Sequence, residues 1–454
     1  MKKSLSTARV QDTIAAIATA PGRGAIALIR LSGDDAFAIA RKHIAPWPSS
    51  PRAVNLCTIS NDERVLDRAL VTLFPGPDSF TGEDTVEIST HGGQVVPVSI
   101  VSALIASGAR PALPGEFTRR AVLNGKLDIL QAEAIGDLID AKSHSMQRVA
   151  LEQLDGGLSR RLLALREELI ELEALIAYDV DFPEEDDGPI DRDTISGKIS
   201  STIRSLKDLL ETVPAGELIR EGAVVVIAGP PNAGKSSLFN AIVGKERAIV
   251  TEIPGTTRDA LEAVVDNGNW PLRLVDTAGL RPTTDRLERL GIEVSERYLS
   301  NAEVILVCCE PDSPIEATVS QVRSLSPAPI IPVRTKADLL PDSYQITDGE
   351  IPVSAETGNG LAELLERTGD LLSARHGQQV IDAPVLTRVR HQRLLSAACG
   401  EMEEFQQAWI GDKVPATVAA VHLRGAVISL EELIGGVDVE DVLDRVFSSF
   451  CVGK

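Results

Sequence analysis

One segment, from Gly229 to Ser237, has the residue types and spacing of a phosphate-binding loop. It reads Gly-Pro-Pro-Asn-Ala-Gly-Lys-Ser-Ser and follows the apolar run 223–228, so a buried strand leads into a glycine-rich turn and then a helix. In that context backbone N–H groups close around phosphates, Lys235 reaches the outer phosphates and Ser236 ligates Mg²⁺. The segment therefore predicts a nucleoside triphosphate site.

Two further segments carry groups that act on Mg²⁺ and the γ-phosphate. The predicted strand 272–276 ends at Asp276, which would act on Mg²⁺ through water, and the N–H of Gly279 would sense the γ-phosphate. Upstream, the polar loop 255–259 reads Gly-Thr-Thr-Arg-Asp, and its Thr257 is a natural second Mg²⁺ ligand. Both segments occur in the order that nucleotide hydrolysis needs.

Two short motifs further along the chain predict which base is bound. The Asp338 carboxylate would accept both N–H groups of the guanine Watson–Crick edge, which adenine does not offer. Lys336 would lie along the base, and the N–H of Ala355 would bind its carbonyl oxygen. The usual motif has Asn where this chain has Thr335, so we expect guanine specificity with somewhat weaker affinity. The motifs together predict a GTPase whose nucleotide contacts include Asn232, Ala233, Gly234, Lys235, Ser236, Ser237, Gly255, Thr256, Thr257, Asp276, Thr277, Ala278, Gly279, Thr335, Lys336, Asp338, Ser354, Ala355 and Glu356.

These motifs do not fix the residue that positions the attacking water. Ras-type enzymes have a Gln directly after the DxxG motif, whereas this chain has Leu280, which offers no hydrogen-bonding group. The segment 281–293 supplies carboxylates on a loop that enters a helix. On residue type alone, each of these carboxylates is better interpreted as a helix-surface charge.

The elements that must hold these loops alternate strand and helix from Gly222 to about residue 375, as in an α/β domain. Helical sequence lies on both sides, with helices expected at 196–211, 389–410, 415–423, 429–435 and 437–450. A leucine stripe predicts the seam of a helical bundle, with a cofactor groove or a parallel dimer coil as alternatives; it comprises Leu158, Leu162, Leu165, Leu169, Leu172 and Ile176.

Outside this block, the first 120 residues alternate short apolar runs with turns. The runs 25–31, 69–74 and 85–89 predict strands of a compact α/β or α+β domain. The acidic run 179–187 contains Pro183 and precedes Gly188, so we expect a solvated loop there, with a cation or basic-partner site as the alternative.

Composition restricts the classes of protein further. The 454 residues are 43% hydrophobic and 24% charged, which excludes global disorder. The net charge is −21, yet residues 1–125 carry 13 basic and 11 acidic side chains, against 11 and 22 in 126–221. This balance disfavours a chain-wide basic nucleic-acid clamp. Five cysteines without CxxC spacing predict a reducing compartment and no zinc site. Since the sequence also lacks an apolar run long enough to span a membrane, we expect a cytoplasmic protein.

Several motifs together resemble those of the MnmE (TrmE) family of tRNA-modification GTPases. In the central block these are the loop with Asn232, the GTTRD loop, and DTAGLR followed by Glu288. The resemblance covers essentially the whole chain, because matching motifs also lie at 12–16, 21–24, 79–84, 91–93, 114–118, 124–128 and 450–454.

The resemblance implies a potassium-activated GTPase that dimerises through its G domains. The matching K⁺ ligands are the Asn232 side chain, the backbone carbonyls of Thr251 and Ile253, and Thr256. The resemblance also extends the nucleotide contacts to Thr251, Glu252, Ile253 and Pro254. A K⁺ held between the phosphates supplies the positive charge that an arginine finger supplies elsewhere. Glu288 matches the family's catalytic glutamate, which orients water.

The resemblance also implies a site for a 5-formyltetrahydrofolate-type one-carbon donor in the N-terminal region. The matching positions are Arg30, Glu87, Lys126 and Lys454. Cys451 matches a candidate reactive, catalytic thiol near the folate, and its alternatives are a buried structural thiol or a prenylation signal.

These inferences give an α/β P-loop GTPase domain inserted into an α-helical domain and preceded by an α/β (α+β) tetrahydrofolate-binding-like domain. The expected segments are 1–120 for folate binding and dimerisation, 121–221 and 379–454 for the helical domain, and 222–378 for the G domain. The resemblance implies a homodimer that forms a heterotetramer with an MnmG (GidA)-like flavoprotein. That assembly would add a carboxymethylaminomethyl-type group at C5 of the wobble uridine of certain tRNAs. The alternatives are a GTP-driven ribosome-assembly switch and a folate enzyme merely regulated by GTP.

Overall fold

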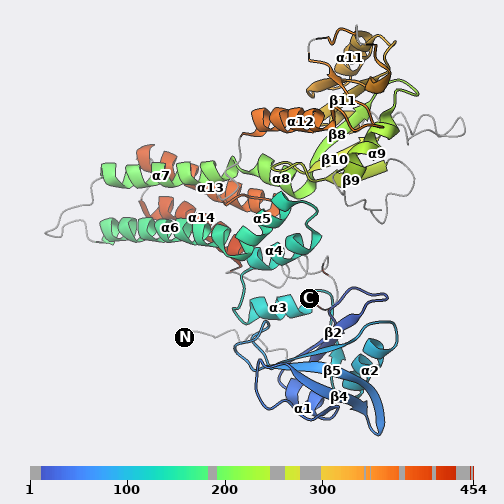
Figure 1. The fold of residues 1–454 in the computed structure, drawn as a ribbon. Coiled ribbons are helices and arrows are strands. Elements are labelled where there is room, and N and C mark those ends of the chain that lie inside the picture. Colours follow the sequence, from blue (N-terminus) through green and yellow to red (C-terminus); the bar gives the residue numbers. More distant parts are fainter. Residues whose placement is uncertain are drawn as a thin grey trace, which may run out of the picture. The chain divides into compact units, whose positions relative to one another are not determined.

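The chain folds, in a computed structural model, into two compact units (Figure 1). Unit 1 comprises Met1–Gly136 and Ile434–Lys454, and unit 2 comprises Asp137–Leu433. The structure describes residues 12–181, 192–245, 261–276, 298–341, 344–347, 349–377, 384–411, 416–435, 450 and 453.

Unit 1 is built on a seven-stranded sheet with the order β3-β4-β5-β6-β2-β1-β7. Neighbouring strands are antiparallel except β1 and β7. Helices α1 (Ala36–Arg41) and α2 (Val96–Ala106) share one core with the apolar side chains of a single sheet face. The predicted strands are present, and the bounds are β1 Ile14–Ile17, β2 Ile26–Ser32, β3 Ile44–Ala45, β4 Asn55–Asn61, β5 Arg64–Phe74, β6 Thr85–His91 and β7 Arg110–Pro111.

A partly buried ionic network joins the start of β1 to helix α3 (Glu116–Leu123). The Arg120 side chain is 4% exposed and donates to Asp12 Oδ1 at 2.6 Å, to Glu83 Oε2 at 3.1 Å and to Glu116 Oε1 at 3.1 Å. Arg110 adds a second guanidinium that bonds Glu116 Oε2 at 2.9 Å. Hydrogen bonds from Arg110 and Arg120 lower the pKa of Asp12; burial acts to raise the pKa of Glu116, but these bonds outweigh it and the pKa is lowered.

This network predicts acid sensitivity of unit 1. Because the folded pKa values of Asp12 and Glu116 lie below their unfolded values, their stabilisation is present above about pH 5 and is lost as pH falls through the folded values. We expect Glu116→Gln to destabilise unit 1 by about 1–3 kcal/mol at pH 7 and to flatten its loss of stability in acid. Hydrogen exchange of β1 peptides between pH 7 and pH 4 measures both effects.

The matched control is Glu63→Gln, which makes the same change at an exposed turn. An unchanged acid profile in Glu116→Gln would refute the role of the network.

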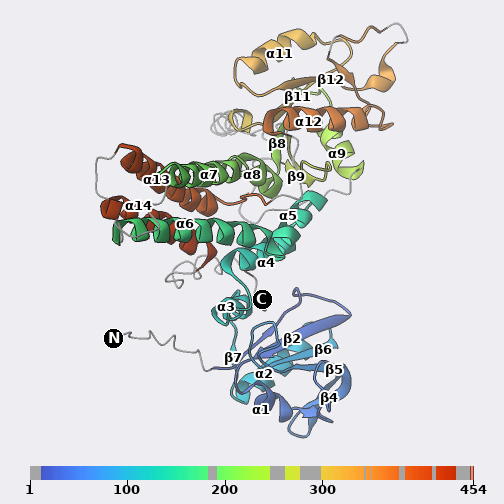
Figure 2. The ribbon, with the colours of Figure 1, turned by 90° about the vertical axis from the view of Figure 1, so that its left-hand side faces the viewer.

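The helices of unit 2 form a bundle in which α7 packs against both α6 and α13 (Figure 2). Every member of the predicted leucine stripe on α6 is buried, which confirms the seam of a helical bundle. The two helices expected at 415–423 and 429–435 are instead one helix, because no residue between them breaks it. The bounds are α4 Ile129–Asp140 (shared with unit 1), α5 His144–Leu154, α6 Gly157–Asp181, α7 Arg192–Leu210, α8 Val213–Glu221, α13 Val389–Gly411 and α14 Ala416–Ile434. Helix α6 thus includes the first residues of the acidic run 179–187, which we expected to be a loop. The expected helix 437–450 lies almost wholly outside the described residues.

Between α8 and α13, unit 2 contains a six-stranded sheet with the order β13-β12-β11-β8-β10-β9. All neighbours are parallel except β9 and β10. Helices α9 (Lys235–Lys245) and α12 (Leu361–His376) pack on one face, and α11 (Ile315–Arg323) packs on the other. The strands are β8 Ala223–Ala228, β9 Leu261–Val265, β10 Leu272–Asp276, β11 Val304–Cys309, β12 Ile330–Arg334 and β13 Ile351–Pro352. The carboxyl ends of the parallel strands meet at one edge, where such folds bind ligands.

No helix in the described ranges is both long and apolar enough to cross a membrane.

Candidate nucleotide-binding site

The loop between β8 and α9 has the backbone that the phosphate-binding sequence predicts. Gly229 has φ +141°, and a Cβ there would lie 2.3 Å from the Cys308 carbonyl oxygen, so only glycine fits. Asn232 and Gly234 also have positive φ, at +64° and +76°. The loop can therefore turn its N–H groups inward at the start of α9.

Three of the predicted phosphate and Mg²⁺ residues lie together at this loop. The Lys235 ammonium donates to the carbonyl oxygens of Gly229 at 2.9 Å and Pro230 at 2.7 Å. The Ser236 hydroxyl donates to Asp276 Oδ2 at 2.6 Å, and Asp276 is fully buried at the end of β10. A hydroxyl beside a carboxylate is the oxygen donor set that Mg²⁺ prefers, so these residues fit that ion.

The predicted base-reading residues line a cavity of about 710 Å³ next to α9. Lys336, Asp338, Ala355 and Glu356 line this cavity together with Thr335. Asp338 accepts a hydrogen bond at Oδ1 from the buried Ser354 hydroxyl at 2.6 Å. This bond fixes the carboxylate, while the Lys336 ammonium pairs with Glu310, a residue that sequence reasoning missed.

Thr335 joins the base-binding and phosphate-binding parts of the site. Its hydroxyl lies 2.9 Å from the Ala233 carbonyl oxygen and 3.1 Å from that of Cys309. Thr335 is only 4% exposed, and its N–H also bonds the Cys309 oxygen at 3.0 Å. The single hydroxyl hydrogen of Thr335 is thus shared between the carbonyl oxygens of the phosphate-binding loop and of the end of β11, whereas an amide group would have two hydrogens to donate.

This contact predicts the effect of removing the hydroxyl. We expect Thr335→Val to keep the shape of the side chain and leave the Ala233 oxygen without its donor, at a cost of about 1–2 kcal/mol. Fluorescent GDP should then dissociate about tenfold faster, as stopped-flow fluorescence measures. Thr318→Val on α11, on the opposite face of the sheet, is the control. Equal dissociation rates in wild type and Thr335→Val would contradict the contact's role.

A buried ion pair next to Thr335 is a further feature that the sequence did not predict. Arg334 bonds Glu350 and donates to the backbone oxygens of Glu310 at 2.6 Å and Ser313 at 2.8 Å. Burial acts to raise the pKa of Glu350, but hydrogen bonds from Arg334 and the Thr347 N–H outweigh it and lower the pKa. No local pattern around these residues signals the pair, because it forms between a strand end and a later loop.

Several predicted residues lie outside the part of the chain that the structure describes. They are the Mg²⁺ and K⁺ candidates Thr251, Ile253, Thr256 and Thr257, their neighbours Glu252, Pro254 and Gly255, the segment Thr277, Ala278 and Gly279, the catalytic candidates Glu288 and Cys451, and Lys454. Of the predicted K⁺ ligands, the described ranges contain only Asn232, which is exposed.

In unit 1, the structure brings two of the predicted folate residues together. Arg30 on β2 and Glu87 on β6 are cross-strand partners, and Arg30 Nη2 donates to Glu87 Oε1 at 2.7 Å. The guanidinium carbon lies 5.3 Å from the Phe80 ring centroid and 5.6 Å from that of Phe117. The stem of a third predicted residue, Lys126, lies against Gly82. The arrangement offers a charged pair beside a partly exposed aromatic ring.

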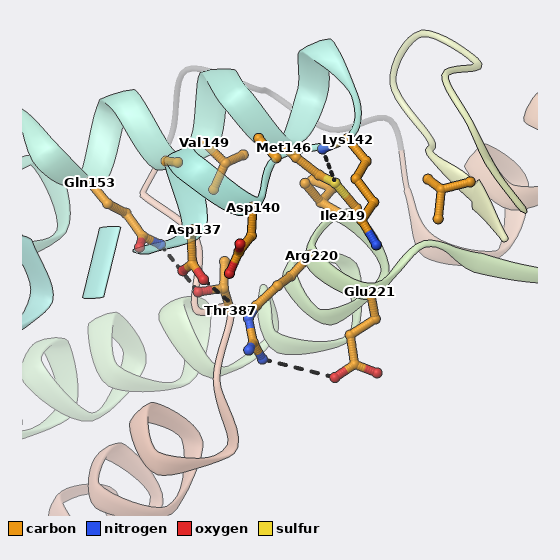
Figure 3. Close-up of a pocket in the computed structure, with 13 residues that line it drawn as sticks. Asp137, Asp140, Lys142, Met146, Val149, Gln153, Ile219, Arg220, Glu221 and Thr387 are labelled. Atoms are coloured by element: carbon orange, nitrogen blue, oxygen red, sulfur yellow. Dashed lines mark hydrogen bonds and ion pairs between the residues drawn. The ribbon is translucent and has the colours of Figure 1, made fainter. Parts of the chain in front are cut away.

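A second cavity in unit 2, of about 290 Å³, contains none of the predicted site residues (Figure 3). Its apolar floor includes Met146 and Ile219. At the rim, Asp137 pairs with Arg220 at 3.4 Å and with Arg388 at 2.7 Å. The lining carries both acidic and basic side chains, so the cavity has no single sign of charge.

Two family profiles and many full-length relatives match this chain. The profile of the GTP-binding protein TrmE N-terminus matches residues 13–126, and that of the MnmE helical domain matches residues 129–451. The tRNA modification GTPase MnmE of Neisseria meningitidis serogroup B is 40% identical over 448 residues, which cover 97% of this chain and 99% of the relative. The protein of the same name from Heliobacterium modesticaldum is 40% identical over 468 residues and covers 98% of this chain and 100% of the relative.

Among solved structures, the G domain of the T. maritima FeoB iron transporter is 24% identical to the matched part. The match covers 33% of this chain and 98% of that chain, with a TM-score of 0.26. At that TM-score the likeness carries no argument about function.

Proposed function

This chain belongs to the MnmE family of tRNA modification GTPases, and we propose that it hydrolyses GTP at the β8–α9 loop in the course of tRNA wobble-uridine modification. The observation that carries the proposal is the convergence of Lys235, Ser236 and Asp276 with the Asp338 pocket at one sheet edge. Phosphate, metal and base ligands thus lie where one nucleotide would contact them all.

In this proposal each described residue has one task. Lys235, which donates to the carbonyl oxygens of Gly229 and Pro230, would bind the outer phosphates, and Ser236 and Asp276 would hold a Mg²⁺, Asp276 through water. Mg²⁺ neutralises charge on the phosphates when bound. We assign water orientation to Glu288, since Leu280 cannot serve, and this assignment rests on sequence alone.

We propose K⁺ as the cation that replaces an arginine finger, with Asn232, Thr251, Ile253 and Thr256 as ligands. A monovalent ion aimed at the developing charge acts as a preorganised electrostatic group. We expect GTP hydrolysis in KCl to exceed that in NaCl by about tenfold to a hundredfold at equal ionic strength, measured as phosphate release. Equal rates in the two salts would rule out the potassium assignment.

We propose that unit 1 binds a 5-formyltetrahydrofolate-type donor at Arg30, Glu87, Lys126 and Lys454, with Cys451 nearby. The pair of guanidinium and carboxylate beside Phe80 supports this, because a pterin offers both polar edges and a stacking face. The chain would act as a homodimer and with an MnmG-like flavoprotein. Its domain boundaries and its cytoplasmic location stay predictions from the sequence.

The experiment that tests the function is mass spectrometry of tRNA nucleosides from cells that lack this protein. We expect the carboxymethylaminomethyl-type group to be missing from wobble uridine, to return with the wild-type chain and to stay missing with Lys235→Ala. An unchanged wobble uridine in the deletion cells would overturn the proposal. Full rescue by Lys235→Ala would instead separate the modification from GTP hydrolysis.

A further inference from the structure

Three potential metal ligands meet where α14 lies beside α13 in unit 2. Glu401 and Glu404 are three residues apart on α13, so they project from adjacent turns of one face. His422 on α14 directs its Nδ1 toward both, at 2.7 Å from Glu401 Oε2 and 3.3 Å from Glu404 Oε2. All three ligand atoms lie within 4.8 Å of one another.

Among the residues that the structure describes, no basic side chain other than His422 pairs with the two carboxylates of this cluster. One imidazole nitrogen carries at most one hydrogen, so it cannot donate to both carboxylates at once. A cation between the three atoms would satisfy both carboxylates together.

The spacing and exposure fit a small divalent ion. Zinc–nitrogen and zinc–oxygen distances of about 2.0–2.2 Å at tetrahedral angles separate neighbouring ligand atoms by roughly 3.3–3.5 Å. The distance from His422 Nδ1 to Glu404 Oε2 already has this length, and the distance from His422 Nδ1 to Glu401 Oε2 would have to increase by roughly 0.6 Å. The His422 side chain is 32% exposed, so an ion can enter from solvent.

We propose that Glu401, Glu404 and His422 form a binding site for a zinc-like divalent transition ion, with water as the fourth ligand. The imidazole selects such an ion over Mg²⁺, which prefers oxygen ligands and keeps its water. The cysteine pattern argued against a zinc site, but this donor set contains no cysteine. The ion would tie α13 to α14, the helix that precedes the C-terminal segment.

The test is calorimetric titration of Zn²⁺ into the full-length chain, treated with chelator and free of Mg²⁺ and nucleotide. We expect one equivalent to bind to wild type and His422→Gln to weaken this binding by about 100-fold or more, since even outer-shell changes cost about 10–100-fold. Co²⁺ as a second probe should give visible d–d absorption only when His422 is present. His91→Gln removes another exposed histidine that pairs with a single carboxylate, Asp67 at 2.8 Å, and should change neither result.

A second variant separates metal binding from folding. A Cβ at Gly425 would lie 3.0 Å from Glu401 Cδ, so Gly425→Ala should shift the Glu401 carboxylate although all three ligand residues remain in the chain. Because alanine favours helix, this variant should melt no lower without metal yet bind Zn²⁺ more weakly. No saturable binding to wild type, or equal affinity in wild type and His422→Gln, would overturn the proposal and leave an ordinary ion pair.

Discussion

Asp338→Asn should change the preferred nucleotide from GTP to XTP. The carboxylate accepts two N–H groups of guanine, whereas an amide accepts one and donates one. Xanthine has a carbonyl oxygen where guanine has its amino group, so it matches the amide. Asn also keeps an oxygen that can accept the 2.6 Å bond from Ser354, so the pocket should keep its shape.

We expect kcat/KM for GTP to fall by at least about 10³-fold, because sites that lose buried polar partners reject a ligand by about 10⁴–10⁵. Initial rates of phosphate release with GTP and XTP at equal concentrations measure the change. Asp370→Asn, the same substitution on the exposed side of α12, should leave the GTP rate unchanged. Undiminished GTP hydrolysis by Asp338→Asn would mean that another group reads the base.

Glu350→Ala should strongly destabilise unit 2. The Glu350 side chain is 1% exposed and that of Arg334 is 5% exposed, so removing the carboxylate leaves a buried guanidinium without its counter-charge. Breaking such a pair costs about 3–5 kcal/mol. For a region of this size we expect the melting temperature to fall by about 10 °C.

The same substitution should weaken nucleotide binding, because Arg334 directly precedes Thr335 and holds the end of β11 through the Glu310 carbonyl oxygen. Thermal denaturation with and without GDP measures both effects. Glu350→Gln keeps one acceptor oxygen, which can still accept from Arg334 and the Tyr344 hydroxyl, and loses only the acceptor of the Thr347 N–H. Its loss of stability should therefore be smaller. Glu366→Ala on the exposed face of α12 is the control, with a change within about 0.5 kcal/mol. If Glu350→Ala lowers the melting temperature no more than Glu366→Ala does, the ion pair does not stabilise unit 2.

The sequence predicted those features of the fold and the site that depend on residues close together in the chain. The β8–α9 loop was predictable because its glycines, lysine and serine perform their tasks within one short segment. The leucine stripe was predictable because a helix repeats its buried face at a fixed period. Helix α14 was divided wrongly: Gly425, a weak helix former, lies between the two expected segments, but the buried Ala426 and Val427 pack in the core and the helix continues through it.

The sequence by itself determined the family, the nucleotide motifs and the bundle seam, since each is written in residues that are neighbours or that follow one period. Only the tertiary structure decided that Thr335 bonds Ala233, 102 residues away, that Arg334 pairs with Glu350, and that His422 meets Glu401 and Glu404. These contacts depend on strand order and on how two helices pack, which fix the separation of distant side chains. The local sequence around each of these residues does not determine that separation.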